Sequence, residues 1–156
     1  MSTARKNEVT LIRVLDAPRE KVWRAFRDAE ALREWWGLPR SAAMTACQID
    51  FRVGGTLHCG IAMPGRPEIW FKWIYREIAE GERLVMEQHF SDAAGRELDS
   101  AERPASTITL VFEAMGAKTK LTVTHADMAS QTYPAEMYEQ GWSESLDRLA
   151  GSLAGR

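Results

Sequence analysis

The stretch PAEMYEQGWSESLDRLAGSL, from Pro134 to Leu153, decides the fold of this chain. Pro134 suits the first turn of a helix, where the missing backbone N–H costs little. Large apolar side chains then recur every three or four residues, which places them on one helix face: Tyr138, Trp142, Leu146, Leu149 and Leu153. The opposite face is mostly charged. We therefore expect a long amphipathic helix whose apolar face needs a partner surface.

Most of the remaining chain shows the two-residue alternation of β-strands. Around Trp73, for example, Phe71 and Tyr75 alternate with Lys72 and Arg76, so the aromatic set should point inward. Glycine- and proline-rich turns separate the segments. Seven strands are expected, at Glu8–Leu15, Ala46–Val53, Thr56–Met63, Ile69–Ile78, Leu84–Phe90, Ser106–Glu113 and Lys118–His125.

Two short helices, Pro18–Arg27 and Ala29–Trp36, are predicted after the first strand. Every connection from strand to strand is short, so the sheet should be antiparallel. The apolar face of the sheet has to be shielded from water, and the three predicted helices can pack against it. We expect an α+β fold in which a curved seven-stranded antiparallel sheet wraps around the long C-terminal helix. A single domain over residues 1–156, with its core at about 8–154, suits this length.

The composition argues against several classes of function. A net charge of −2 and a pI near 6.0 give no electrostatic basis for binding nucleic acid. No segment approaches the roughly 18 consecutive apolar residues of a membrane span, and the first residues hold no apolar signal core. We expect a cytoplasmic protein without membrane insertion. Cys47 and Cys59 lack CxxC spacing, and two buried, reduced thiols are the expectation.

Several short strings of the sequence, taken in order, resemble one family. They are distributed over nearly the whole chain and include Asp16-Ala17-Pro18, Trp35-Trp36-Gly37, Asp50-Phe51-Arg52-Val53-Gly54-Gly55, Tyr75-Arg76-Glu77-Ile78 and Gly141-Trp142-Ser143-Glu144-Ser145-Leu146. The chain is similar to the START-related (SRPBCC) helix-grip superfamily, in the branch of the activator of heat-shock protein 90 ATPase. The resemblance implies an apolar cavity between sheet and terminal helix. It therefore implies a small hydrophobic or amphipathic ligand, such as a lipid or a polyketide-like aromatic. No cofactor is expected.

Inward strand positions and the apolar helix face supply the candidate ligand-binding residues. Gln88 and His125 are notable because a buried polar side chain needs a partner, which is either a ligand or a neighbouring group. Relatives usually have glycine where this chain has Trp73, and this side chain would either fill the cavity or stack on a flat ligand. The expected contacts are Trp36, Phe71, Trp73, Tyr75, Met86, Gln88, Phe112, His125, Tyr138 and Trp142.

Two other functions stay open. Some members of the superfamily are cyclases or aromatases, and an enzyme of that kind would use His125, Tyr75 or Glu87 as its acid or base. A protein-interaction module similar to the co-chaperone would carry an exposed apolar patch on the outer side of the sheet. Such a patch, at Trp70, Ile74 and Val85, would also suit a homodimer or a contact with the chaperone.

No catalytic or metal-binding motif is recognisable in the sequence. His58, His89 and His125 fall on three different predicted strands, without the spacing of zinc ligands. Neither a GxSxG motif nor a phosphate-binding loop occurs. We therefore expect neither a metal site nor a catalytic set. The polar segment from Ser91 to Ala105 is long enough to act as a lid.

Overall fold

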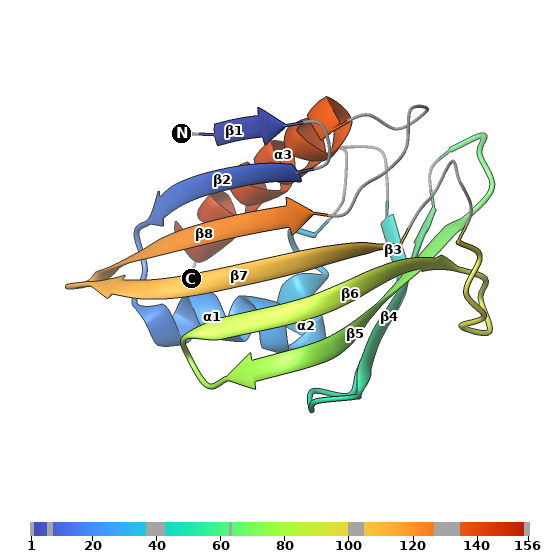
Figure 1. Cartoon of the computed structure of the whole chain (residues 1–156), viewed down its shortest axis with the longest axis horizontal. Coiled ribbons are helices and arrows are strands. Elements are labelled where there is room, and N and C mark those ends of the chain that lie inside the picture. Colours follow the sequence, from blue (N-terminus) through green and yellow to red (C-terminus); the bar gives the residue numbers. More distant parts are fainter. Residues whose placement is uncertain are drawn as a thin grey trace.

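A computed structural model describes residues 2–5, 8–36, 43–62, 64–99, 105–126 and 135–154. One curved antiparallel sheet and three helices make up these residues (Figure 1). No helix among them is long and apolar enough to cross a membrane. The elements are β1 Ser2–Arg5, β2 Glu8–Leu15, α1 Arg19–Arg27, α2 Ala29–Leu32, β3 Ala43–Ile49, β4 Thr56–Ala62, β5 Ile69–Ala79, β6 Arg83–Ser91, β7 Ser106–Met115, β8 Lys118–Ala126 and α3 Ala135–Ala154.

The sheet has eight strands in the order β1-β2-β8-β7-β6-β5-β4-β3. The seven strands expected from the sequence are all present, and the antiparallel meander from β3 to β8 is confirmed. The additional strand is β1, which pairs with β2 from Ser2 opposite Leu11 to Arg5 opposite Glu8. Its four residues carry no apolar alternation, so the pattern could not reveal it. The expected ends at Met63 and Pro134 lie outside the described residues.

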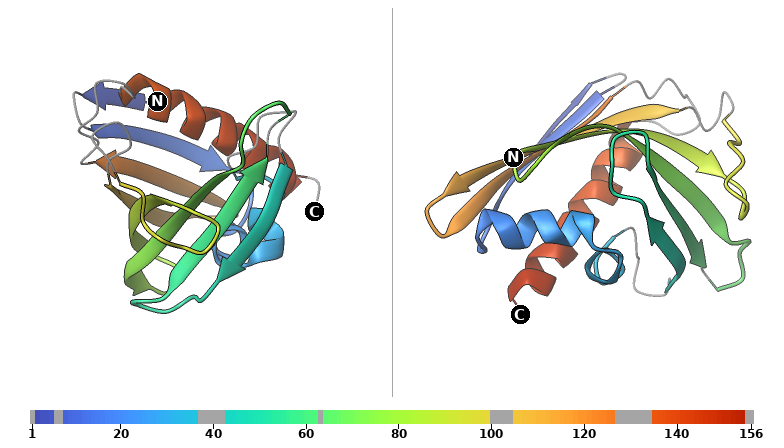
Figure 2. Two further views of the ribbon diagram at one scale, coloured as in Figure 1. Left: turned by 90° about the vertical axis from the view of Figure 1, so that its right-hand side faces the viewer. Right: turned by 90° about the horizontal axis from the view of Figure 1, so that it is seen from below.

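The sheet arches over the three helices, and α3 crosses its concave side (Figure 2). The apolar face of α3 is buried as its periodicity predicts, with Leu146 and Leu149 fully inaccessible and Trp142 4% exposed. Polar ties fix the helix on β2, because the Arg13 guanidinium binds the Asp147 carboxylate at 2.6 Å and donates to the Ser143 hydroxyl at 2.8 Å. The expected helix-grip arrangement is confirmed.

The part of the concave face under α1 and α2 is a closed aromatic core. Phe112 of β7 meets Trp23 and Phe26 of α1 edge to face, with ring centroids 5.1 and 5.5 Å apart. Phe26 in turn meets Trp35 at 4.7 Å. The indole N–H of Trp35 donates to the Ala25 carbonyl at 3.1 Å, so its polar group is satisfied. Edge-to-face contacts of this kind stabilise beyond the area they bury.

Two elements end four residues earlier than the sequence prediction, and the other described ends differ by fewer residues. The second helix ends at Leu32 rather than Trp36, and residues 33–36 continue as turns. β3 ends at Ile49, because the next residues form a turn in which the Arg52 N–H donates to the Asp50 carbonyl at 3.0 Å and the Gly55 N–H to the Arg52 carbonyl at 2.8 Å. Gly55 fits that turn because a Cβ there would lie 2.2 Å from the Asp50 carbonyl oxygen.

Candidate functional site

A pocket of about 250 Å³ lies between the N-terminal half of α3 and the concave face of the sheet. Strands β4, β5, β6 and β8 and the turn after α2 supply the rest of its wall. Most of the lining is aromatic or aliphatic. The lining residues are Trp36, Ile61, Ile69, Phe71, Gln88, Phe90, His125, Tyr138, Gly141, Trp142 and Ser145.

Aromatic contacts hold the pocket wall in place. The Trp36 ring lies 4.7 Å from Trp142 of α3 and 6.0 Å from Phe71 of β5, so it joins helix and sheet. Gly141 is exposed, and a Cβ placed on it would meet no heavy atom within 4 Å. The helix therefore presents bare backbone to the pocket beside Trp142.

A buried polar chain runs along one side of the pocket. The Trp142 indole N–H donates to Nδ1 of His125 at 3.0 Å, and Nε2 of His125 lies 2.7 Å from the Ser106 hydroxyl. An indole can only donate, so Nδ1 accepts, and the proton of a neutral ring sits on Nε2. Burial lowers the pKa of His125 to about 3, so the ring is neutral at physiological pH. Both of its nitrogens already have protein partners.

Gln88 is a polar residue of the pocket wall whose side chain a ligand can use. Its Oε1 accepts the Trp73 indole N–H at 2.9 Å, which directs the amide oxygen toward Trp73. The amide nitrogen donates to none of the residues that the structure describes. Two N–H donors thus remain on a side chain that lines the pocket.

Trp73 fills the interior rather than lining the pocket. It is fully buried, its ring lies 4.9 Å from Trp36, and it is absent from the pocket wall. The Trp73–Trp36 pair therefore separates the pocket from the closed core under α1 and α2.

The structure brings six of the ten predicted residues together at the pocket. These are Trp36, Phe71, Gln88, His125, Tyr138 and Trp142. The other four, Trp73, Tyr75, Met86 and Phe112, do point inward, but they lie in the closed core. Strand parity specifies the face on which a residue lies, whereas the pocket covers only part of the length of each strand.

Five lining residues were missed by the sequence reasoning. Ile61, Ile69 and Phe90 share strand parity with Cys59, Phe71 and Gln88, so the same alternation could have found them. Gly141 and Ser145 share the face of α3 with Tyr138 and Trp142 at helical spacing. Their small side chains gave no hydrophobic signal.

The acid–base candidates of the enzyme hypothesis are not gathered at the pocket. The Tyr75 hydroxyl is buried in the closed core without a hydrogen-bond partner among the described residues, and burial raises its pKa. Glu87 lies on the opposite face of the sheet, where hydrogen bonds from His89 and Arg76 lower its pKa. Of the three, His125 alone reaches the pocket, and its ring nitrogens are occupied.

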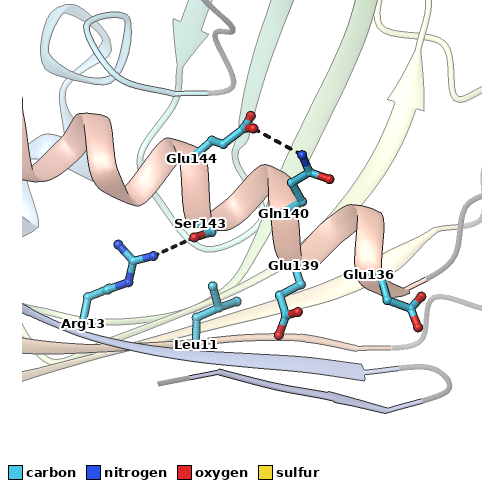
Figure 3. A pocket seen from close by; sticks show the side chains of 7 residues that line it. All are labelled: Leu11, Arg13, Glu136, Glu139, Gln140, Ser143 and Glu144. Atoms are coloured by element: carbon cyan, nitrogen blue, oxygen red, sulfur yellow. Dashed lines mark hydrogen bonds between the residues drawn. The ribbon is translucent and has the colours of Figure 1, made fainter.

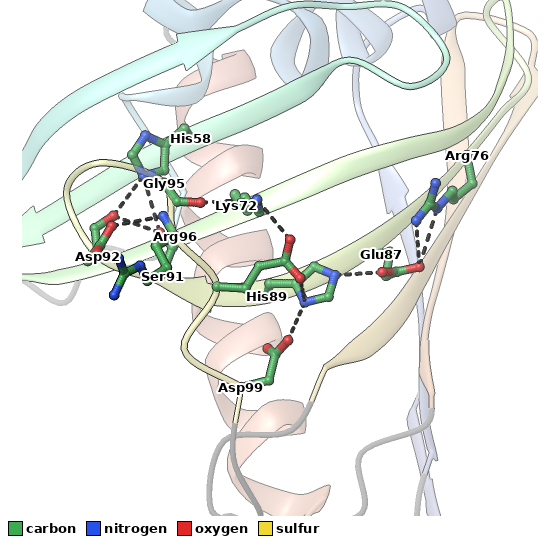
Figure 4. Close-up of polar contacts among 11 residues, drawn as sticks. His58, Lys72, Arg76, Glu87, His89, Ser91, Asp92, Gly95, Arg96 and Asp99 are labelled. Carbon is green, nitrogen blue, oxygen red and sulfur yellow. Dashed lines mark hydrogen bonds and ion pairs between the residues drawn. The ribbon is translucent and has the colours of Figure 1, made fainter.

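A charged network covers the outer face of β5 and β6 (Figure 4). His89 places Nδ1 2.6 Å from the Asp99 carboxylate and Nε2 2.6 Å from that of Glu87. Burial opposes protonation of His89, but the hydrogen bonds to Asp99 and Glu87 outweigh it and raise the pKa. His89, Glu97 and Asp99 also have the donor types of a metal site, within 4.8 Å of one another. A metal needs an unprotonated nitrogen, whereas this geometry favours a proton on each.

The first half of the expected lid is anchored on this outer face, opposite the pocket. The Lys72 ammonium binds the Glu97 carboxylate and the Gly95 carbonyl, both at 3.1 Å. His58 contacts the Ser91 hydroxyl at 3.1 Å. Residues 91–99 therefore do not cover the pocket, and residues 100–104 lie outside the described part.

The apolar patch that the interaction hypothesis requires is interrupted. All three of its residues, Trp70, Ile74 and Val85, are half-buried rather than exposed, and Lys72 stands between Trp70 and Ile74 on the same strand face. The Trp70 ring is partly covered by His58, at a centroid distance of 4.8 Å.

A second, larger groove of about 450 Å³ lies between β2 and α3 (Figure 3). Its chemistry differs from that of the aromatic pocket, since Glu136, Glu139 and Glu144 dominate its wall. Arg13, its cation, is already bound by Asp147 and Ser143. These mutually repelling carboxylates, of which Glu136 and Glu144 are exposed, offer a ligand little apolar surface. We therefore assign the candidate site to the smaller aromatic pocket.

A curved antiparallel sheet that grips a terminal helix, with a pocket beside that helix, defines a helix-grip protein. Within this class, the chain belongs to the Activator of Hsp90 ATPase homolog 1-like family, whose family model matches residues 16–154. The family resemblance seen in the sequence is thus confirmed. A comparison with curated proteins gave no match.

Solved structures of bacterial proteins share the fold over nearly the full length. A Chromobacterium violaceum protein is 28% identical, with a TM-score of 0.77, over 94% of this chain and 96% of that one. An Arthrobacter aurescens protein is 22% identical, with a TM-score of 0.81, over 99% and 92%. An AHSA1-like protein from Aeromonas hydrophila is 17% identical, with a TM-score of 0.75, over 95% and 92%. The last two likenesses concern the fold alone.

Proposed function

We propose that this protein binds a compact, mostly apolar molecule of one or two rings in the pocket beside α3. The observation that carries the proposal is the lining of that pocket: aromatic walls from Trp36, Phe71 and Trp142 surround a side chain, Gln88, with unused hydrogen-bond donors. Few polar groups in an apolar cavity are typical of small-molecule sites.

The volume limits the size of the ligand. Drug-sized ligands occupy pockets of about 300–1,000 Å³, whereas an engineered cavity of about 150 Å³ accepts benzene. A pocket of about 250 Å³ falls between these values and suits one or two fused rings. Of the two ligand classes expected from the sequence, a small aromatic molecule fits better than a lipid with long chains.

The lining also specifies the polarity of the ligand. Among the described residues that line the pocket there is no Asp, Glu, Lys or Arg, and burial keeps His125 neutral. An ionised ligand would lose its hydration without gaining a counter-charge. A neutral ligand that carries one hydrogen-bond acceptor would meet the Gln88 amide.

Quinoline and naphthalene provide a matched pair of probes, because quinoline has the same shape and one ring nitrogen that can only accept. Both should bind in isothermal titration calorimetry, and quinoline should bind about three- to tenfold more tightly, the contribution of one hydrogen bond. In Gln88→Met, a thioether of similar shape leaves a weak acceptor for the Trp73 indole N–H, but the amide donors are lost. The preference for quinoline should then disappear.

A solvent extract of the purified protein, examined by mass spectrometry, should contain a small aromatic compound. The proposal would be refuted if neither probe bound and the extract contained no small molecule. Equal affinity for both probes in the unmodified protein would contradict the role of Gln88.

A further inference from the structure

The two cysteines face each other across the outermost pair of strands on the β3 side of the sheet. Cys47 of β3 lies directly opposite Cys59 of β4, and their sulfur atoms are 2.9 Å apart. Both are free thiols. A disulfide bond is about 2.04 Å long, so the sulfurs need to approach by less than about 1 Å to be joined.

The backbone register is favourable for a bond between them. Opposed residues in an antiparallel ladder alternate between hydrogen-bonded and non-hydrogen-bonded pairs, and the latter bring their Cα atoms to about 4.5 Å. Asp50 donates its N–H to the Thr56 carbonyl at 2.8 Å, so these two residues form a hydrogen-bonded pair. Cys47 and Cys59 lie three residues from Asp50 and Thr56, respectively, so in this alternation they form a non-hydrogen-bonded pair. The expected Cα separation falls within the range of disulfides.

The two thiols differ in their surroundings. Cys59 is fully buried, whereas Cys47 is partly exposed near the edge of the sheet. The hydrogen bond from the Cys59 thiol lowers the pKa of Cys47, with a further contribution from the Arg33 guanidinium, while the same hydrogen bond and burial raise the pKa of Cys59. A more acidic, reachable thiol next to a buried one is the arrangement of an attacking and a resolving cysteine.

We propose that Cys47 and Cys59 are a redox-active pair that a hydroperoxide converts into a disulfide joining β3 to β4. The Cys47 thiolate attacks one oxygen of hydrogen peroxide, the O–O bond breaks, and hydroxide leaves to be protonated to water. The Cys59 sulfur then attacks the resulting sulfenic sulfur of Cys47. The S–O bond breaks, and the hydroxide leaves as water with the Cys59 proton. In sum, two thiols and one peroxide give one disulfide and two water molecules.

The pair lies next to the aromatic pocket without being part of it. Cys59 is opposite Phe71 on β5 and two residues from Ile61 on the same face, and both neighbours line the pocket. A disulfide would fix the edge strand β3 beside this wall. The proposal rests on the strand register and holds whether or not the pocket binds a ligand.

The test compares peroxide-treated with reduced full-length protein by alkylation under denaturing conditions and mass spectrometry. Treated protein should lose two hydrogens and both alkylation sites. Trypsin should then release a peptide in which Cys47 and Cys59 are linked, since Arg52 separates them in the sequence. Alkylation of both thiols after treatment, or linkage only between chains, would overturn the proposal.

Single substitutions test the assigned roles. In Cys59→Ser, Cys47 should stop at the sulfenic acid, which dimedone traps. In Cys47→Ser, the buried Cys59 should react with dimedone at least tenfold less. Circular dichroism would check that each variant is folded, and equal labelling of the two variants would contradict the assignment of Cys47 as the attacking thiol.

Discussion

The concave face of one sheet carries two regions that share residue types but differ in packing. Under α1 and α2, aromatic side chains pack edge to face and leave no space for a ligand. Phe112, for example, packs in this way against Trp23 and Phe26. Under the N-terminal half of α3, similar side chains surround a pocket of about 250 Å³. The difference lies in how the face is covered: α1, α2 and α3 close one region, whereas in the other Gly141 leaves the helix without a side chain.

Trp73 lies at the boundary between these regions, and its replacement by glycine should cause the largest loss of stability. Truncating a buried aromatic side chain costs about 3–5 kcal/mol, and glycine within a strand adds up to about 1 kcal/mol. We expect urea denaturation to show a loss of about 3–6 kcal/mol in the free energy of unfolding. The folded variant should also bind acridine, a three-ring analogue of quinoline that the unmodified pocket is too small to hold. A variant as stable as the parent protein would show that Trp73 does not close the core.

Truncating one phenylalanine in each region should compare the two directly. Phe112→Ala in the closed core should lower the free energy of unfolding by about 3–5 kcal/mol. Phe90→Ala in the pocket wall should cost about 1–2 kcal/mol, because that side chain is only partly buried in the first place. Denaturation curves of both variants would measure the difference, and equal losses would mean that the two regions are packed alike.

On the outer face, His89 and Glu87 should make a smaller contribution to stability that depends on pH. Because the folded pKa of His89 is raised, its contribution to stability is complete below its ordinary value of 6.5 and is lost as the pH rises through the folded value. The pKa of Glu87 is lowered by the hydrogen bond from His89, so its contribution is lost in acid, below its ordinary value of 4.5. The pair should therefore stabilise most between pH 4.5 and 6.5.

The corresponding measurement is the free energy of unfolding of the parent protein and of His89→Gln across this range. The difference between them should be largest near pH 6 and should shrink toward about pH 9. A difference that grows with pH would contradict the doubly protonated ring inferred from the contacts to Asp99 and Glu87.

The sequence predicted which elements form and which face each residue occupies. Period-two alternation identified seven strands, and the spacing of Tyr138, Trp142 and Leu146 identified the gripped helix. The strands and the helix depend on local backbone geometry, so the spacing of apolar residues in the sequence reveals them. β1 was not predicted, because an edge strand held by backbone pairing needs no apolar residues.

The position of the pocket could not be predicted in the same way. Trp73 and Phe71 have identical parity on one strand, yet one is in the closed core and the other in the pocket wall. What separates them is the path of the helices above the sheet, which depends on contacts distant in sequence. The hydrogen-bond partner of Gln88 could not be predicted either, because that prediction requires knowing that Trp73 lies opposite Gln88 on β5.

The central claim is that the space beside Gly141 binds a ligand, and a matched pair of glycine replacements tests it most directly. Gly141 and Gly151 both lie in α3, and a Cβ on either would meet no heavy atom within 4 Å, but only Gly141 lines the pocket. Leucine at either position should favour the helix by up to about 1 kcal/mol. Titration with quinoline should show binding at least tenfold weaker in Gly141→Leu and unchanged in Gly151→Leu. Equal affinity in both variants would contradict the proposed site.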